Sequence, residues 1–175
     1  MRIKPTDKIL DFGSGTGRNA CLMNKDLSEN GEIIGLDISE EMMAQFRKKC
    51  SKFPNVKIVE ARIDEELPYK NYFDKAFISF VLHGFPQDVR ERIIENAARA
   101  LKNRGEFFIL DYNEFSLKDA PLYARLAFKL IECPYAFDFI EKDWKKILRS
   151  HGFSDFGEHR FFGKYIRLLK GIKTE

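Results

Sequence analysis

The sequence predicts an α/β fold with a doubly wound, mostly parallel sheet of seven strands that ends in an antiparallel hairpin. Short apolar runs alternate along the chain with segments of helical periodicity, which is typical of helices that cross between parallel strands. A glycine-rich turn follows the first run, and the end of the chain reads as two strands around a turn. The chain has 175 residues, 44% of them hydrophobic, so we expect residues 1–175 to form a single domain.

The first strand runs directly into a turn that contains three glycines. Residues 9–17 read ILDFGSGTG, so an apolar run delivers Asp11 to the carboxyl end of a strand. Gly13, Gly15 and Gly17 allow the backbone to turn sharply without Cβ clashes before a helix begins. We therefore expect a nucleotide-like cofactor to lie directly against this main chain.

The spacing of the glycines indicates which cofactor binds. A dinucleotide fingerprint, G-x-G-x-x-G, needs a third glycine where this chain has Arg18, which counts against NAD. The observed pattern D-x-G-x-G-x-G resembles motif I of the class I methyltransferases that use S-adenosylmethionine, and IIGLDIS at residues 33–39 resembles its second half. The resemblance implies a Rossmann-like fold, S-adenosylmethionine as cofactor, and cofactor contacts from Asp11 and the three glycines.

A second buried strand at residues 33–36 ends in Asp37. This acid stands about twenty residues beyond the glycine turn, where a carboxylate can accept hydrogen bonds from ribose hydroxyls. The alternative interpretation is an acid at the start of a helix, since Ser39 is suited to cap the helix that follows. The resemblance adds Ile38 to the predicted cofactor site.

The remaining elements follow from periodicity. Apolar residues recur at helical spacing in four segments that we expect to pack on the sheet: residues 20–27, 43–50, 89–101 and 140–148. Further strands are expected at residues 56–60, 75–82 and 106–112.

The carboxyl-terminal region predicts a hairpin, with strands at residues 153–161 and 164–169 joined around Gly163. Class I methyltransferases end their sheet with such an antiparallel pair, whereas a nicotinamide-binding domain is not expected to. We expect the basic residues of the carboxyl end to form a solvated edge that discourages strand pairing: Lys164, Arg167, Lys170 and Lys173.

The segment YKNYFDKAFISFVLHGF resembles the fourth-strand motif of small-molecule methyltransferases. The resemblance places Ser79 beside the methionine part of the cofactor and His83 near the reacting methyl group. If the acceptor carries a proton, a general base is needed, and the candidates at strand ends are His83, Asp111 and Tyr112. His83 is our predicted catalytic residue, and a purely structural histidine is the alternative.

The segment EARIDEELP resembles the third-strand loop that contacts adenine in these enzymes. Ile63 stands where many relatives have an acid, and Asp64 comes one place later. We carry both residues into the predicted cofactor site. A solvated acidic turn at residues 64–66 is the alternative.

Residues 113–139 form an aromatic insertion after the fifth predicted strand, at the edge where open α/β sheets bind ligands. We expect this segment to cover the substrate, and an amphipathic helix on the sheet is the alternative. The resemblance to the quinone-biosynthesis branch implies a small, apolar or aromatic acceptor and in-line methyl transfer. Six side chains could line its pocket: Phe115, Leu122, Tyr123, Phe128, Tyr135 and Phe137.

Charge and cysteine content narrow the class further. A formal net charge of +3 is too small to indicate a nucleic-acid partner. The three cysteines suit neither a disulfide framework nor a metal site, so we expect no metal, Cys21 and Cys50 as small buried side chains, and a reducing, cytoplasmic location. No apolar run has the length of a membrane span, and no signal peptide is evident.

The first strand begins almost at Met1, whereas relatives usually carry a helical segment before it that covers the cofactor. Three explanations therefore stay open: the translated start is placed too late, a partner subunit such as a second copy of the chain in a homo-oligomer covers the site, or the domain binds the cofactor without efficient turnover. Three functions also stay open: a small-molecule methyltransferase, a nonenzymatic or regulatory S-adenosylmethionine-binding module, and a nicotinamide-dependent oxidoreductase, which Arg18 and the hairpin disfavour.

Overall fold

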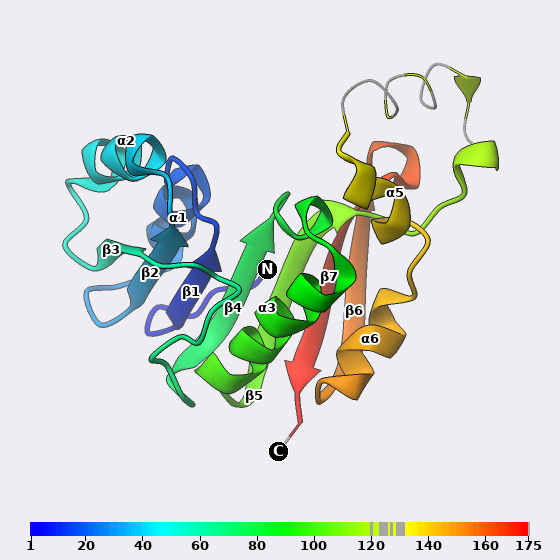
Figure 1. The fold of residues 1–175 in the computed structure, drawn as a ribbon. Coiled ribbons are helices and arrows are strands. Elements are labelled where there is room, and N and C mark those ends of the chain that lie inside the picture. Colours follow the sequence, from blue (N-terminus) through cyan, green and yellow to red (C-terminus); the bar gives the residue numbers. More distant parts are fainter. Residues whose placement is uncertain (120, 123–125, 127, 129–131, 175) are drawn as a thin grey trace.

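The computed structural model describes residues 1–119, 121–122, 126, 128 and 132–174, which contain a seven-stranded sheet of order β3-β2-β1-β4-β5-β7-β6 (Figure 1). The pairs among β1 to β5 are parallel, and β7 is antiparallel to both β5 and β6. The predicted fold class is confirmed. The strands are β1 (Lys8–Phe12), β2 (Glu32–Asp37), β3 (Val56–Glu60), β4 (Phe73–Ser79), β5 (Leu101–Tyr112), β6 (Phe153–Phe161) and β7 (Ile166–Lys173).

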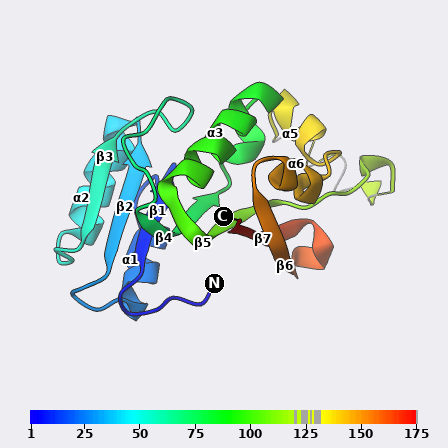
Figure 2. The same cartoon turned by 90° about the horizontal axis from the view of Figure 1, so that it is seen from below.

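Helices cover both faces of the sheet. The helices are α1 (Arg18–Met23), α2 (Glu40–Cys50), α3 (Gln87–Ala100), α5 (Pro134–Phe139) and α6 (Trp144–Ser150), with single turns η1 (Asn24–Asp26), η2 (Leu82–Gly84), η3 (Leu117–Asp119) and η4 (Phe162–Lys164). Helices α1 and α2 lie on one face, and α3, α5 and α6 lie on the other (Figure 2). No helix in the described residues is long and apolar enough to cross a membrane.

The alternation of side chains along β1 explains why both faces are covered. Ile9 belongs to the core that includes Phe46 of α2. Its neighbour Leu10 belongs to the core that includes Ile93 of α3. All four side chains are almost fully buried, as expected for a parallel strand with a helical layer on each side.

Several element boundaries differ from the prediction, and two of them lie in the strands that lead to the site. β5 begins at Leu101 and not at residue 106, because α3 passes into the strand without a loop and Leu101 pairs with Phe73. The prediction had placed Leu101 on the helix. β4 ends at Ser79 and not at residue 82, and the chain turns into η2, which carries His83.

The predicted basic edge at the end of the chain is wrong. The hairpin folds so that β7 lies between β5 and β6, which makes β7 an interior strand and β6 the edge. Arg167 is consequently buried, with ion pairs to Glu114 at 3.0 Å and Glu158 at 3.7 Å. A charged residue can occupy this interior strand because both carboxylates compensate it.

The cysteine prediction also needs correction. Cys21 on α1 and Cys50 at the end of α2 form a disulfide, with their Cα atoms 5.9 Å apart. The two helices pack side by side on one face, so residues 29 positions apart in the sequence meet in space. Cys133 is a free thiol. The cytoplasmic location stays a prediction, now without the support that unpaired cysteines gave it.

Candidate active site

The glycine turn after β1 is shaped by close packing on two sides and by an open face in the middle. All three glycines have positive φ angles, from 54° to 75°. A Cβ on Gly13 would lie 2.8 Å from a methyl group of Val81, and one on Gly17 would lie 2.7 Å from the ring of Phe46. A Cβ on Gly15 would meet no described atom within 4 Å. Gly15 therefore leaves room for a ligand to approach the backbone.

Asp37 at the end of β2 holds this turn in place. Its Oδ2 accepts a hydrogen bond from the amide of Gly15 at 2.7 Å. Its Oδ1 accepts from the amides of Ile38 at 2.9 Å and Ser39 at 3.0 Å. Since a carboxylate has about four acceptor positions, one position on Oδ2 remains for a ribose hydroxyl. Ser39 caps α2 through Met42 at 3.3 Å, so the helix-start interpretation holds alongside the ligand interpretation.

A pocket of about 370 Å³ opens at the carboxyl ends of β1 to β4. It brings together six of the predicted cofactor residues: Gly13, Gly15, Asp37, Ile38, Ile63 and Asp64. The sequence did not single out the other five: Met42, Ala61, Arg62, Val81 and Phe85. Gly17, Asp11 and Ser79 are not among the lining residues; Gly17 begins α1 against Phe46, and Ser79 ends β4.

Asp11 is a buried carboxyl group at the end of β1. Only 1% of the residue is exposed, and its Oδ2 has no hydrogen-bond partner among the described residues. Burial and the nearby charge of Asp37 raise the pKa of Asp11 from 3.8 to about 8. A positive group of a ligand would compensate this carboxylate. With the open face of Gly15 and the acceptor on Asp37, the residues present fit S-adenosylmethionine, which carries a sulfonium, an ammonium and a ribose.

The loop after β3 forms the adenine side of the predicted site. The carbonyl of Ile63 accepts a hydrogen bond from the side-chain amide of Asn96 at 2.9 Å, which fixes this loop to α3. Asp64 forms an ion pair with Arg62 at 2.9 Å, and Arg62 also contacts Glu65 at 2.9 Å. The acids of this loop are thus partly neutralised by Arg62, a partner that the sequence did not indicate.

His83 and Asp111 form a pair at the ends of β4 and β5. His83 Nδ1 lies 2.8 Å from Asp111 Oδ1, and Asp111 also accepts from the amides of His83 and Tyr112. Burial favours the neutral imidazole, but the hydrogen bond and charge of Asp111, together with the charge of Glu132, raise the pKa of His83 above 6.5. The three strand-end candidates therefore form one cluster, in which Asp111 orients the histidine.

Glu132, from the aromatic insertion, completes the cluster. Its Oε2 lies 3.5 Å from His83 Nε2, and its Oε1 accepts a hydrogen bond from the hydroxyl of Tyr112. Burial and this carboxylate raise the pKa of Tyr112 well above its ordinary value, so the hydroxyl stays protonated at neutral pH. The ring of Tyr112 meets the imidazole edge-on at 5.2 Å between centroids.

Arg90 on α3 joins the His83 turn to the insertion. Its side chain is fully buried and donates to the carbonyl of His83 at 3.2 Å and to the carbonyl of Tyr135 at 2.6 Å. It also forms an ion pair with Asp138 at 2.8 Å. Sequence reasoning missed Arg90 because a helical arginine is normally exposed. Its partners lie up to 48 positions away.

The residues of the insertion that were predicted to line the acceptor pocket divide into two groups. Phe115, Phe128 and Phe137 pack against one another and the core, with ring centroids of neighbouring pairs 5.2–5.9 Å apart. Leu122 is 77% exposed and Tyr135 is 47% exposed. Tyr123 lies outside the described residues. Phe128 of the first group also packs edge-on against Tyr112, with ring centroids 5.1 Å apart, while the role of the insertion as a substrate cover stays a prediction.

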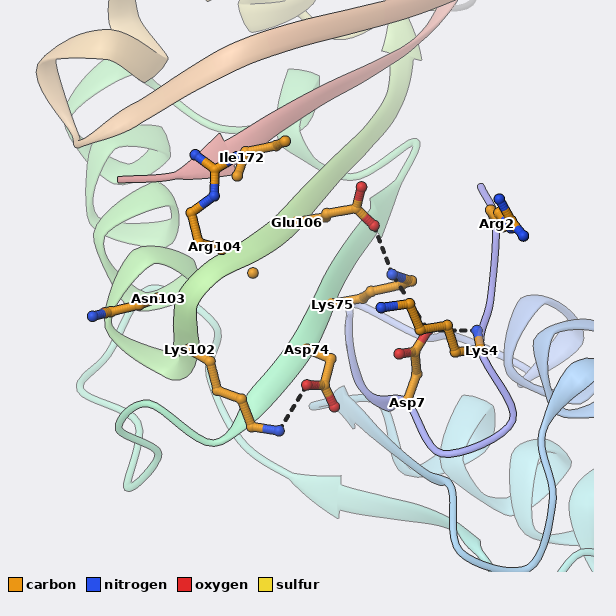
Figure 3. Close-up of a pocket in the computed structure, with 11 residues that line it drawn as sticks. Arg2, Lys4, Asp7, Asp74, Lys75, Lys102, Asn103, Arg104, Glu106 and Ile172 are labelled. Carbon is orange, nitrogen blue, oxygen red and sulfur yellow. Dashed lines mark hydrogen bonds and ion pairs between the residues drawn. The ribbon is translucent and has the colours of Figure 1, made fainter. Parts of the chain in front are cut away.

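A second cavity, of about 570 Å³, lies at the opposite edge of the sheet (Figure 3). Its charges are largely paired within the protein: Lys75 contacts Asp7 at 3.3 Å and Glu106 at 2.6 Å, and Lys102 contacts Asp74 at 2.7 Å. No predicted site residue lines it. It lies at the amino ends of the parallel strands, whereas open α/β sheets bind ligands at the carboxyl ends, so it is not the candidate active site.

Known proteins with similar sequences agree with a pocket for S-adenosylmethionine. Residues 9–105, more than half of the chain, match the family described as methyltransferase domain. The chain is 29% identical over 182 residues to the ubiquinone/menaquinone biosynthesis C-methyltransferase UbiE of Vibrio cholerae. That alignment covers 98% of this chain and 64% of the relative, so the chain spans less than two thirds of that protein's length.

Solved structures share the fold at low sequence identity. A SAM dependent methyltransferase from Aquifex aeolicus matches with a TM-score of 0.73 and 21% identity, covering 99% of this chain and 85% of that chain. Phosphoethanolamine N-methyltransferase 2 from Haemonchus contortus, in complex with S-adenosyl-L-methionine, matches with a TM-score of 0.77 and 15% identity, covering 99% and 50%. These likenesses concern the fold.

Proposed function

This chain belongs to the methyltransferase-domain family, with S-adenosylmethionine as its cofactor, and we propose that it transfers the cofactor's methyl group to a small aromatic acceptor. One observation carries the proposal: the cofactor pocket and the histidine–aspartate pair share a turn. Val81 and Phe85 line the pocket, and His83 stands between them in the sequence. A nucleophile held by His83 would therefore lie next to the cofactor.

The roles of the residues follow from their chemistry. The cofactor supplies a methyl group on positively charged sulfur, which a nucleophile can attack in line. The carboxylate of Asp111 can only accept, so we assign the proton of neutral His83 to Nδ1, which leaves a lone pair on Nε2. Nε2 can then take a proton from the acceptor. The rings of Tyr112 and Phe139 lie against the imidazole of His83, and the ring of Phe128 lies against Tyr112. These surroundings suit an aromatic molecule.

Turnover with a panel of simple phenols and hydroquinones tests the proposal. S-adenosylhomocysteine should be released with at least one acceptor, and His83→Ala should lower turnover by about 10²- to 10⁴-fold, the usual contribution of a general base. The variant should still bind S-adenosylhomocysteine. Wild-type turnover in His83→Ala would end the base assignment, and cofactor binding without transfer to any acceptor would favour the nonenzymatic module.

The pH dependence gives a second test. A base works only in its neutral form, so kcat/KM should rise with pH through a pKa above 6.5. Asp111→Asn removes a carboxylate that stabilises the imidazolium, so this rise should move to lower pH and the maximal rate should fall. If kcat/KM rose at the same pH in Asp111→Asn as in the wild type, the assignment of His83 as the titrating group would be contradicted.

A further inference from the structure

The basic nitrogen of His83 already has an occupant. Glu132 places one carboxylate oxygen 3.5 Å from Nε2 and accepts the hydroxyl of Tyr112 on the other oxygen. The side chain of Glu132 is only 12% exposed and that of His83 only 16%. One carboxylate therefore spans the two groups that an acceptor would have to meet.

The backbone that carries Glu132 is fixed to the His83 turn. The next residue, Cys133, directs its sulfur to the carbonyl of His83 at 3.9 Å, and α5 begins directly after it. Arg90 then binds the carbonyls of His83 and Tyr135 with the same guanidinium nitrogen. Rotation of the Glu132 side chain alone would free His83 Nε2 and the Tyr112 hydroxyl for another hydrogen-bond partner.

His83 is poorly suited to take a proton from an acceptor while Glu132 lies against its Nε2. The groups that face His83 are two carboxylates, Asp111 and Glu132, against one cation, Arg90, with the neutral hydroxyl of Tyr112 beside them. This balance favours the imidazolium, which has no lone pair to accept a proton. Removing Glu132 from Nε2 would favour the neutral base.

A ring hydroxyl has the hydrogen-bonding pattern that would replace this carboxylate. Its proton can be donated to the lone pair of neutral His83, and its oxygen can accept from Tyr112. Apolar rings lie next to both groups. The ring centroid of Phe128 is 5.1 Å from that of Tyr112, and the ring centroid of Phe139 is 6.3 Å from that of His83. A ring ether would fit the apolar surface but could not donate to His83.

Resting on the proposed methyl transfer, we propose that Glu132 selects the acceptor: the site takes a small aromatic molecule whose ring hydroxyl displaces the Glu132 carboxylate from His83 and Tyr112. The hydroxyl proton passes to Nε2, and the electron pair of the broken O–H bond stays on the acceptor as a phenolate. The phenolate oxygen is the nucleophile: it forms an O–CH₃ bond with the methyl carbon, and the electron pair of the broken S–CH₃ bond stays on sulfur, which leaves S-adenosylhomocysteine.

Phenol and anisole are matched probes for this proposal, because they share the ring and differ in the donor. In the wild type saturated with S-adenosylhomocysteine, phenol should bind more tightly than anisole. Glu132→Ala leaves no carboxylate to displace, so phenol should bind about tenfold more tightly than to the wild type, as expected when a charged hydrogen bond need not be broken. Tyr112→Phe should reduce the preference for phenol.

Two further variants complete the test. Glu132→Gln keeps an acceptor for Tyr112 but removes the charge, so the titration of His83 followed by NMR should move to lower pH. Glu141→Gln, an exposed carboxylate nine positions away, is the control and should change neither the titration nor phenol binding. Equal phenol affinity in the wild type and Glu132→Ala would overturn this inference while cofactor binding persists. If the wild type did not bind S-adenosylhomocysteine, the proposed function itself would be overturned.

Discussion

Asp37 uses its carboxylate in the fold, and we propose that the same carboxylate binds the ligand. Three main-chain amides, including that of Gly15, already use it, so the glycine turn depends on the same group that is expected to bind ribose. The sequence predicted the acid from its place at a strand end, but it could not show this shared use. The hydrogen bond to Gly15 joins residues 22 positions apart and appears only when β1 and β2 pair.

Asp37→Ala should therefore weaken both cofactor binding and the fold. Loss of a charged acceptor for backbone amides should lower the free energy of unfolding by about 1–3 kcal/mol, and affinity for S-adenosylhomocysteine should fall. Calorimetric titration and thermal unfolding measure the two effects. Glu60→Ala is the matched control, because Glu60 ends β3 opposite Asp37 and is exposed. Unchanged affinity in Asp37→Ala would show that the ligand lies elsewhere.

Asp11 presents the opposite case, a carboxyl group that the fold leaves without a partner. Its pKa of about 8 exceeds the ordinary 3.8, so the folded protein binds more protons than the unfolded chain between these values. Folding stability must then fall as pH rises from about 4 to 8. A cation in the pocket would offset that loss, which is what a sulfonium or ammonium group of the cofactor would supply.

Asp11→Asn should remove this loss of stability. The amide does not ionise, so its burial costs the same at every pH. Without cofactor, the variant should therefore become more stable relative to the wild type as pH rises from 4 through 8. Its affinity for S-adenosylmethionine should be lower than that of the wild type. Thermal unfolding at a series of pH values tests the first effect, and parallel curves for the two proteins would show that Asp11 is not the buried titrating group.

Glu132 and Arg90 mark the limit of residue-level prediction. Strand ends could be located from apolar runs, so Asp11, Asp37 and His83 stood out. Glu132 follows no strand, and Arg90 lies in an ordinary amphipathic helix, and both acquire their roles from partners about 50 positions away in the sequence. No local pattern in a single sequence carries such pairings.

At the scale of elements, apolar periodicity was sufficient to predict seven strands and four helices, but it missed α5 and several boundaries. β5 and α3 join without a turn residue, so no glycine or proline marked the start of the strand at Leu101. The order of the hairpin strands was also beyond the sequence. Either strand could have paired with β5, and pairing through β7 put Arg167 inside the sheet.

The disulfide between α1 and α2 is the clearest test at this scale. Cross-linking residues 29 positions apart should stabilise the protein by about 3–4 kcal/mol relative to the reduced chain. Cys21→Ser and Cys50→Ser should each lower the melting temperature, and added dithiothreitol should lower that of the wild type only. Thiol titration of the unreduced, unfolded chain should find Cys133 alone; three reactive thiols would refute the bond.

For the molecule as a whole, strand order assembles the site. β2, β1, β4 and β5 are consecutive in the sheet, so their carboxyl ends bring Asp37, the glycine turn, His83 and Asp111 along one edge. The sequence placed these residues at strand ends, but their order along the edge depends on how the strands pair and was not predicted. The same edge receives the insertion that carries Glu132. The proposed cofactor and acceptor sites thus meet at the end of β4, the middle strand of the sheet (Figure 1).

All the roles proposed above depend on binding of S-adenosylmethionine at this edge, and calorimetric titration of the purified chain with S-adenosylhomocysteine measures that binding. NAD and NADP serve as controls under the same conditions. The structure predicts saturable, one-to-one binding of S-adenosylhomocysteine that Asp37→Ala weakens, with neither dinucleotide bound. Binding of NAD, or no binding of S-adenosylhomocysteine by the wild type, would contradict it.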